Sequence, residues 1–140
     1  MMFINGKFSK GHATEVIQVL NPATEEIIDE VPSGTVEDAR TAIEAARTAF
    51  QVWRKVPAGE RAAMLHAVAA RIRTYHREIV HLLTMEEGKP LPENEEEVWW
   101  TEETFDYYAE LGRHERGWVI PPGNASQFNF VIKEPWGVVA

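Results

Sequence analysis

The sequence contains no cysteine, and this absence excludes a disulfide framework, a thiolate metal site and a cysteine nucleophile. It has no apolar run that approaches the roughly 20 residues of a membrane-spanning helix. Its opening residues reach the turn signal Asn5-Gly6 too soon for a secretory signal peptide. These absences predict a soluble, cytoplasmic chain with no membrane partner.

Basic residues are also few, with 14 Lys and Arg against 22 Asp and Glu and a net charge of −8. Nucleic acid is disfavoured as a partner because no cationic surplus exists to neutralise its phosphates. The sequence has no GxGxxG nucleotide cradle, no HExxH metal motif and no serine with a histidine partner at motif spacing. Gly88-Lys89 is followed by Pro90 rather than Ser or Thr, so it is not a phosphate-binding P-loop. On these grounds the chain carries no visible active site.

What is present is an ordinary globular composition, with 140 residues of which 44% are hydrophobic, enough for one α+β domain with its own core. Residues 1–34 are predicted to form β-hairpins. Asn5-Gly6 is a two-residue turn signal because both residues tolerate a positive φ. Two further strands, Glu15–Leu20 and Glu25–Val31, flank a turn in which Pro22 takes the second position.

Residues 35–112 are predicted to form a helical layer, since apolar residues recur there at alternating spacings of three and four. Thr35 can cap the first helix, which Pro57 ends. A second helix is marked by Leu65, Val68, Ile72 and Tyr75, and the apolar pattern revives at Ile79, Leu82 and Leu83. Gly88 can take the left-handed conformation that ends a helix. The last helix covers roughly 92–112 and carries a run of carboxylates.

The tail from Trp118 returns to strand character. After a turn at Pro121–Asn124, Phe128, Phe130 and Ile132 follow the period of two that is typical of a half-buried strand. Residues 137–140 are predicted to begin a fully buried strand.

Glu93 and Glu97 are the most obvious candidates for chemistry when the residues are considered alone. They lie one turn apart on the last predicted helix and could share a cation or act as an acid–base pair. A run of carboxylates on a helix more often forms a solvated face. The solvated face is therefore favoured over a carboxylate-based hydrolase.

Seven segments, in order and spread along essentially the whole chain, resemble the aldehyde dehydrogenase superfamily. They are Phe3–Phe8, Val19–Glu25 (like the family's NPATGE turn), Thr35–Phe50, Trp53–Arg61, Glu86–Leu91 (like its GKPL element), Phe105–Ala109 and Glu134–Val139. Two positions depart from the family pattern. Glu25 stands where the family usually has glycine, and Trp136 stands where it usually has leucine.

The resemblance implies a division of the chain. Residues 1–117 would be the amino-terminal part of a cofactor-binding domain, which is Rossmann-like α/β in the full-length family, with hairpins over 1–34 and helices over 35–112. Residues 118–134 resemble the first strands of the arm through which subunits assemble. Residues 135–140 look like the start of the first strand of the dinucleotide-binding sheet.

The resemblance also implies a chemistry that this chain cannot perform alone. The family oxidises aldehydes to acids: a Cys thiolate attacks the aldehyde, hydride passes to NAD or NADP, and a Glu activates water to hydrolyse the thioester. None of these residues maps onto this sequence. We therefore expect no catalytic residue and no cofactor-binding residue here, and we expect the chain alone to bind neither NAD nor NADP and to be inactive.

Four positions match family features outside the chemistry. By motif position, the backbone carbonyl of Leu20 and the carboxylate of Glu97 would be ligands of a structural monovalent cation. Tyr108 and Leu111 lie on the helix that skirts the substrate tunnel in the family. Packing of that helix explains both residues equally well.

Two hypotheses for the function remain. The chain is either a fragment of an NAD(P)-dependent aldehyde dehydrogenase or a stand-alone, non-catalytic interaction or assembly module derived from that family. In the second case we expect a dimer or tetramer formed through residues 118–134, because the predicted Phe128–Ile132 strand leaves an apolar edge unpaired.

Overall fold

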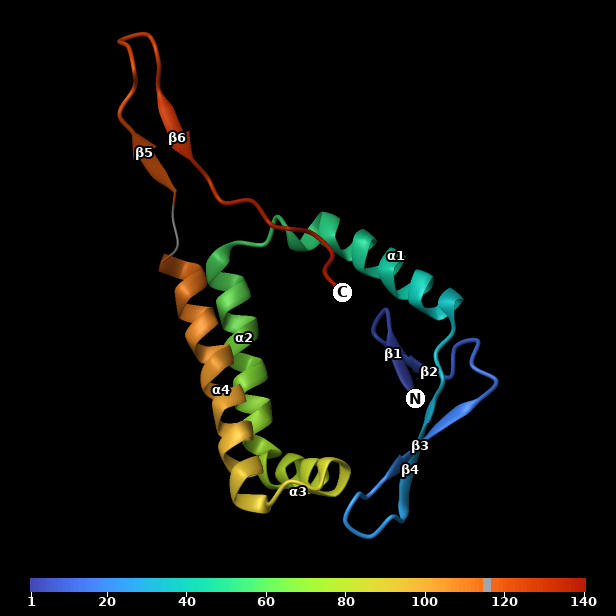
Figure 1. Cartoon of the computed structure of the whole chain (residues 1–140). Coiled ribbons are helices and arrows are strands. Elements are labelled where there is room, and N and C mark those ends of the chain that lie inside the picture. The colour runs from blue at the N-terminus through green and yellow to red at the C-terminus, as the bar shows by residue number, and fades with distance from the viewer. Residues whose placement is uncertain (115–116) are drawn as a thin grey trace.

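The computed structural model describes residues 1–114 and 117–140. Its elements are β1 (Met2–Ile4), β2 (Lys7–Ser9), β3 (Val16–Leu20), β4 (Ile27–Pro32), α1 (Val36–Trp53), α2 (Ala58–Thr74), α3 (His76–Glu87), α4 (Leu91–His114), β5 (Trp118–Ile120) and β6 (Asn129–Val131). The strands in the described residues form three separate antiparallel pairs, β1–β2, β3–β4 and β5–β6. Figure 1 shows α2 and α4 side by side, with α3 at one end of this pair and the β5–β6 hairpin projecting beyond the other. The predicted α+β class is confirmed.

The first hairpin forms as predicted. Asn5 and Gly6 have φ angles of 51° and 75°, which give the turn a twist that matches its flanking strands. Phe3 and Phe8 face each other across the two strands, with ring centroids 4.9 Å apart.

The second hairpin has a longer turn than the sequence predicts. The backbone carbonyl of Asn21 accepts a hydrogen bond from the N–H of Glu25 at 2.7 Å, and its side-chain Oδ1 accepts one from the N–H of Ala23 at 2.9 Å. Glu25 has a φ of 60°, so it belongs to the turn, and β4 begins only at Ile27. The strand predicted over Glu25–Val31 was therefore wrong at its start.

The cap predicted for α1 is confirmed. The hydroxyl of Thr35 accepts a hydrogen bond from the N–H of Asp38 at 3.2 Å, and Oδ2 of Asp38 accepts one from the N–H of Thr35 at 2.9 Å. This reciprocal arrangement satisfies two backbone donors that helix formation leaves without partners. The helix ends at Trp53, shortly before Pro57.

The core lies where α2, α3 and α4 meet. Its buried apolar residues are Ala62 and Ala69 of α2, Val80 of α3, and Val98 and Ala109 of α4. Three of these five are alanines, and such small side chains allow helix backbones to approach closely. None of the helices in the described part of the chain is long and apolar enough to cross a membrane.

The second predicted helix is in fact two helices. Tyr75, with φ −103° and ψ 13°, departs from helical geometry and separates α2 from α3. This break turns α3 so that it contacts α4 as well as α2. Gly88 ends α3 with a φ of 73°, as predicted.

The tail differs from two predictions. β5 pairs with β6, but Phe128, Phe130 and Ile132 are exposed rather than half-buried, because only two strands are present and nothing in the described residues covers them. The buried strand predicted at 137–140 does not form, and Val139 is 80% exposed. A strand needs a neighbour to satisfy its backbone groups, and no strand of the described chain lies beside this segment.

Candidate functional site

The Asn21-Pro22 turn packs against the connector between α3 and α4. A Cβ added to Gly88 would stand 2.6 Å from Cγ of Pro22, so the two segments are in direct contact. Leu20 ends β3 just before this turn. On the other side of the contact, Lys89 follows Gly88 and donates a hydrogen bond from its ammonium to the carboxylate of Glu97. The fold thus brings the segments that carry Leu20 and Glu97 close together.

The partner of Glu97 is an ammonium group rather than a second carboxylate. The hydrogen bond to Glu97 is the main cause that raises the pKa of Lys89, and the nearby charges of Glu87 and Glu93 add to it. A shared proton between Glu93 and Glu97 has no support in this arrangement. No group of three or more His, Cys, Asp or Glu side chains in residues 1–114 and 117–140 could hold a metal ion. The assignment of a monovalent cation to Leu20 and Glu97 stays a prediction.

Asn94 holds the same connector in place, a role that was not predicted from the sequence. Its side chain is fully buried in the first turn of α4. The Nδ2 group donates to Oγ1 of Thr84 at 2.9 Å and to the backbone carbonyl of Lys89 at 3.3 Å. An asparagine within a run of glutamates gives no sequence signal for this role, because the role depends on how the chain turns between α3 and α4.

Tyr108 and Leu111 both reach the surface of α4. Tyr108 is 57% exposed and packs edge to face on Tyr107, with ring centroids 5.2 Å apart. Leu111 is half-buried. The two residues line neighbouring surface hollows that share Glu103 and Tyr107. Their assignment to a tunnel wall stays a prediction.

A ladder of ion pairs joins α2 and α3 to α4. Arg73 pairs with Glu102 at 3.3 Å and also pairs with Asp106. Nδ1 of His76 lies 2.8 Å from Glu102, whose side chain is only 6% exposed. The interpretation of the acidic run as a solvated face is therefore wrong for Glu102, because its carboxylate is turned toward the cations of α2 and α3.

His66 of α2 extends this set of ion pairs, because each of its two ring nitrogens lies within hydrogen-bond distance of a carboxylate of α4. Nδ1 lies 2.5 Å from Asp106 and Nε2 lies 2.8 Å from Glu110. Only the imidazolium form can donate from both nitrogens, and these hydrogen bonds raise the pKa of His66. Arg73 and then His66 lower the pKa of Asp106. The spacing of Glu102, Asp106 and Glu110 by four residues was the sequence signal for this shared helix face.

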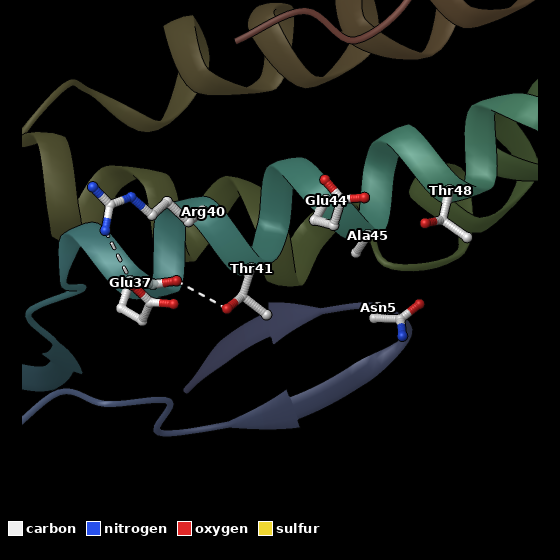
Figure 2. A pocket seen from close by; sticks show the side chains of 7 residues that line it. All are labelled: Asn5, Glu37, Arg40, Thr41, Glu44, Ala45 and Thr48. Carbon is white, nitrogen blue, oxygen red and sulfur yellow. Dashed lines mark hydrogen bonds and ion pairs between the residues drawn. The ribbon is translucent and has the colours of Figure 1, made fainter.

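A surface hollow of about 570 Å³ lies between the β1–β2 turn and α1 (Figure 2). Its charged groups compensate each other: Arg40 pairs with Glu37 at 3.3 Å, and Thr41 donates to the backbone carbonyl of Glu37 at 2.9 Å. Glu44, which also faces the hollow, pairs with Arg47 at 3.4 Å. Each of these charged groups therefore already has a partner, and none of them is left unpaired for a ligand.

Comparison with known proteins agrees with the motif series. Residues 8–140 match the profile of the aldehyde dehydrogenase family. The chain is 39% identical over 137 residues to lactaldehyde dehydrogenase of Escherichia coli, covering 98% of this chain and 29% of that protein. It is 36% identical to betaine aldehyde dehydrogenase 1 of rice, Oryza sativa, covering 99% of this chain and 29% of that protein.

Solved structures show the same relationship. The crystal structure of betaine aldehyde dehydrogenase from Staphylococcus aureus in complex with NAD+ superimposes with a TM-score of 0.90 at 30% identity, over 95% of this chain and 27% of that one. The chain belongs to the aldehyde dehydrogenase family, and it spans about 29% of the length of the curated relatives it matches.

Proposed function

We propose that this chain is the amino-terminal part of an NAD(P)-dependent aldehyde dehydrogenase, a subunit that oxidises an aldehyde to a carboxylic acid. The observation that carries this proposal is the match of nearly the whole chain to under a third of each relative. Residues 1–117 would be the outer part of the cofactor-binding domain. In that setting Leu20 and Glu97 would hold a monovalent cation, and Tyr108 and Leu111 would form part of the tunnel wall.

The proposal assigns no catalytic step to this chain. The sequence has no cysteine to supply the thiolate nucleophile and no GxGxxG cradle for a dinucleotide. No residue of this chain is therefore assigned to a bound NAD or NADP. What the chain supplies is a helical scaffold, in which the ion pairs between α2 and α4 fix the helix that carries Tyr108 and Leu111.

A complementation assay tests this function. The chain alone should not reduce NAD+ or NADP+ with lactaldehyde or betaine aldehyde. Mixed with E. coli lactaldehyde dehydrogenase from which the matching amino-terminal segment has been deleted, it should restore lactaldehyde oxidation. Turnover by the chain alone would contradict the proposal, and so would a failure to restore activity when the two pieces co-elute as a folded complex.

A second candidate function is a non-catalytic assembly module that associates with itself through residues 118–134. The observation in its favour is the exposure of large apolar residues on the β5–β6 hairpin. Trp118 is 60% exposed and Phe128 is 74% exposed. Burial of such surface stabilises a complex by roughly 25 cal/mol per Å² before the costs of association. Light scattering coupled to size exclusion should show a dimer or tetramer, and a monomer at high concentration would exclude this function.

A further inference from the structure

A surface hollow of about 360 Å³ forms where the connector between α1 and α2 meets the segment that follows β6. Its lining residues are Trp53, Arg54, Arg61, Lys133, Glu134 and Pro135. Figure 1 shows the tail of the chain running along this connector after it leaves β6. Residues far apart in the sequence thus contribute cationic and aromatic side chains to one place.

Two guanidinium groups in this hollow are held in position without being neutralised. Arg61 donates from Nη1 to the backbone carbonyl of Val56. The guanidinium carbon of Arg54 lies 5.4 Å from the centroid of the Phe50 ring. A carbonyl and an aromatic ring orient a guanidinium but carry no net negative charge.

Neither guanidinium forms an ion pair with a carboxylate of the described residues. By contrast, Arg40, Arg47 and Arg113 each pair with a glutamate of the same helix. In a chain with a net charge of −8, two oriented arginines that form no such ion pair give this hollow a local excess of positive charge, in which Glu134 is the one opposing group. The chemistry that such a pair recognises is a planar or tetrahedral oxyanion bound through several charge-assisted hydrogen bonds.

Trp53 adds a second recognition element to the hollow. The residue is 44% exposed and lines the hollow together with the two cations. Aromatic faces stack on planar rings, and arginines bind phosphate, so the combination fits a phosphate group with or without an attached ring. Glu134 is the one carboxylate among the lining residues and opposes an anion.

We propose that the hollow lined by Trp53, Arg54 and Arg61 binds the phosphate group of a small anionic molecule. This inference is independent of the proposed enzymatic function, because none of its residues belongs to the cation site or the tunnel wall considered above. The affinity comes from local charge, since the net charge of the chain repels an anion at long range.

Isothermal titration calorimetry on the full 140-residue chain at low ionic strength tests this site. The probes are inorganic pyrophosphate, ADP and adenosine. Pyrophosphate and ADP should bind with one site per chain, and adenosine, which lacks phosphate, should not. Binding should weaken as salt is added.

Two substitutions with opposite expected effects sharpen the test. Arg54→Gln should weaken pyrophosphate binding about tenfold, which corresponds to loss of one charge-assisted contact. Glu134→Gln should strengthen it severalfold by removing the opposing charge. Arg61 is left intact because its bond to Val56 supports the connector between the helices.

Arg71→Gln is the matched control. Its guanidinium also lies over an aromatic ring, 5.1 Å from the centroid of Tyr75, but outside the hollow. Unchanged binding in this variant supports the site, whereas a loss equal to that of Arg54→Gln would mean a diffuse charge effect and would overturn it. Absence of binding by both pyrophosphate and ADP would overturn it as well.

Comparison of pyrophosphate with ADP also distinguishes a site for the phosphate group alone from a site for a nucleotide. Equal affinities for pyrophosphate and ADP support a site that reads the phosphate group alone. A higher affinity for ADP that is lost in Trp53→Leu supports a nucleotide whose ring stacks on the indole.

Discussion

The carboxylate of Asp38 receives both the backbone N–H and the imidazole Nδ1 of His12, each at 2.9 Å. The same carboxylate also caps α1 through Thr35. One buried side chain therefore fastens the loop after β2 to the start of the first helix. Gly11 makes the approach possible, because a Cβ at this position would stand 2.3 Å from Oδ1 of Asp38.

This arrangement predicts a pH dependence of stability on the acid side. Hydrogen bonds from the backbone N–H groups of Thr35 and His12 are the main causes that lower the pKa of Asp38. A lowered folded-state pKa means that this stabilisation is complete above the unfolded value of 3.8 and is lost as the pH falls below it. Asp38→Asn should lower the melting temperature at pH 7, and the difference from the parent chain should shrink toward pH 3. A difference that is constant from pH 7 to pH 3, followed by circular dichroism, would contradict this account.

Glu25→Gly should stabilise the chain. Glu25 has a φ of 60°, a left-handed conformation that costs a side-chain-bearing residue about 1–2 kcal/mol. Part of this gain is offset by the greater freedom of glycine in the unfolded chain, so we expect a net gain of about 0.5–1 kcal/mol in urea unfolding. Glu26→Gly is the control, since Glu26 is not among the residues with positive φ. Equal effects of both substitutions would show that the turn is not strained at Glu25.

Gly88→Ala should destabilise the chain by about 2 kcal/mol or more, because a left-handed backbone and a steric clash act together. Gly88 has a φ of 73°, and the added Cβ would meet Cγ of Pro22 at 2.6 Å. The matched control is Gly112→Ala in α4, where an added Cβ meets no atom within 4 Å. Alanine there should stabilise by up to about 1 kcal/mol through its higher helix propensity. Thermal unfolding that ranks the two variants in the reverse order would refute the contact between the turn and the connector.

The two hydrogen bonds of His66 lead us to expect a second pH dependence of stability, opposite in sign to that of Asp38. The hydrogen bonds that His66 donates to Asp106 and then to Glu110 raise its pKa above 6.5, so the stabilisation is complete below that pH and is lost as the pH rises through the folded-state pKa. The melting temperature of the parent chain should therefore fall relative to that of His66→Gln between pH 6 and pH 9. A scan by differential scanning fluorimetry at fixed ionic strength measures this difference. Parallel profiles for the two chains would mean that His66 does not bridge the two carboxylates in solution.

The local elements were largely predictable because their signals are local. Asn5-Gly6 forms a turn since both residues accept positive φ, Thr35 caps a helix through its own hydroxyl, and Gly88 ends one through its left-handed backbone. The family could also be recognised from short motifs in order. Tyr75 was missed as a helix break, because its residue type is compatible with a helix and only the packing of α3 on α4 requires the bend.

The candidate site residues were less predictable, since their partners lie elsewhere in the chain. The acidic residues of α4 were visible in the sequence, but nothing local showed that Glu102 turns inward to Arg73 and His76 while Glu97 meets Lys89. The hollow at Trp53 and Arg61 was unpredictable for the same reason. It forms because the tail of the chain brings residues 133–135 next to the connector between α1 and α2.

The sequence by itself determined the hairpin turns, the helix caps, the α+β class and the membership of the aldehyde dehydrogenase family, because backbone preferences and motif order are properties of neighbouring residues. Only the tertiary structure decided which charges are buried, which cations meet which carboxylates, and that residues 137–140 remain unpaired. Those outcomes depend on contacts between distant segments. The free energy of a charge or a strand is set by what lies against it in space.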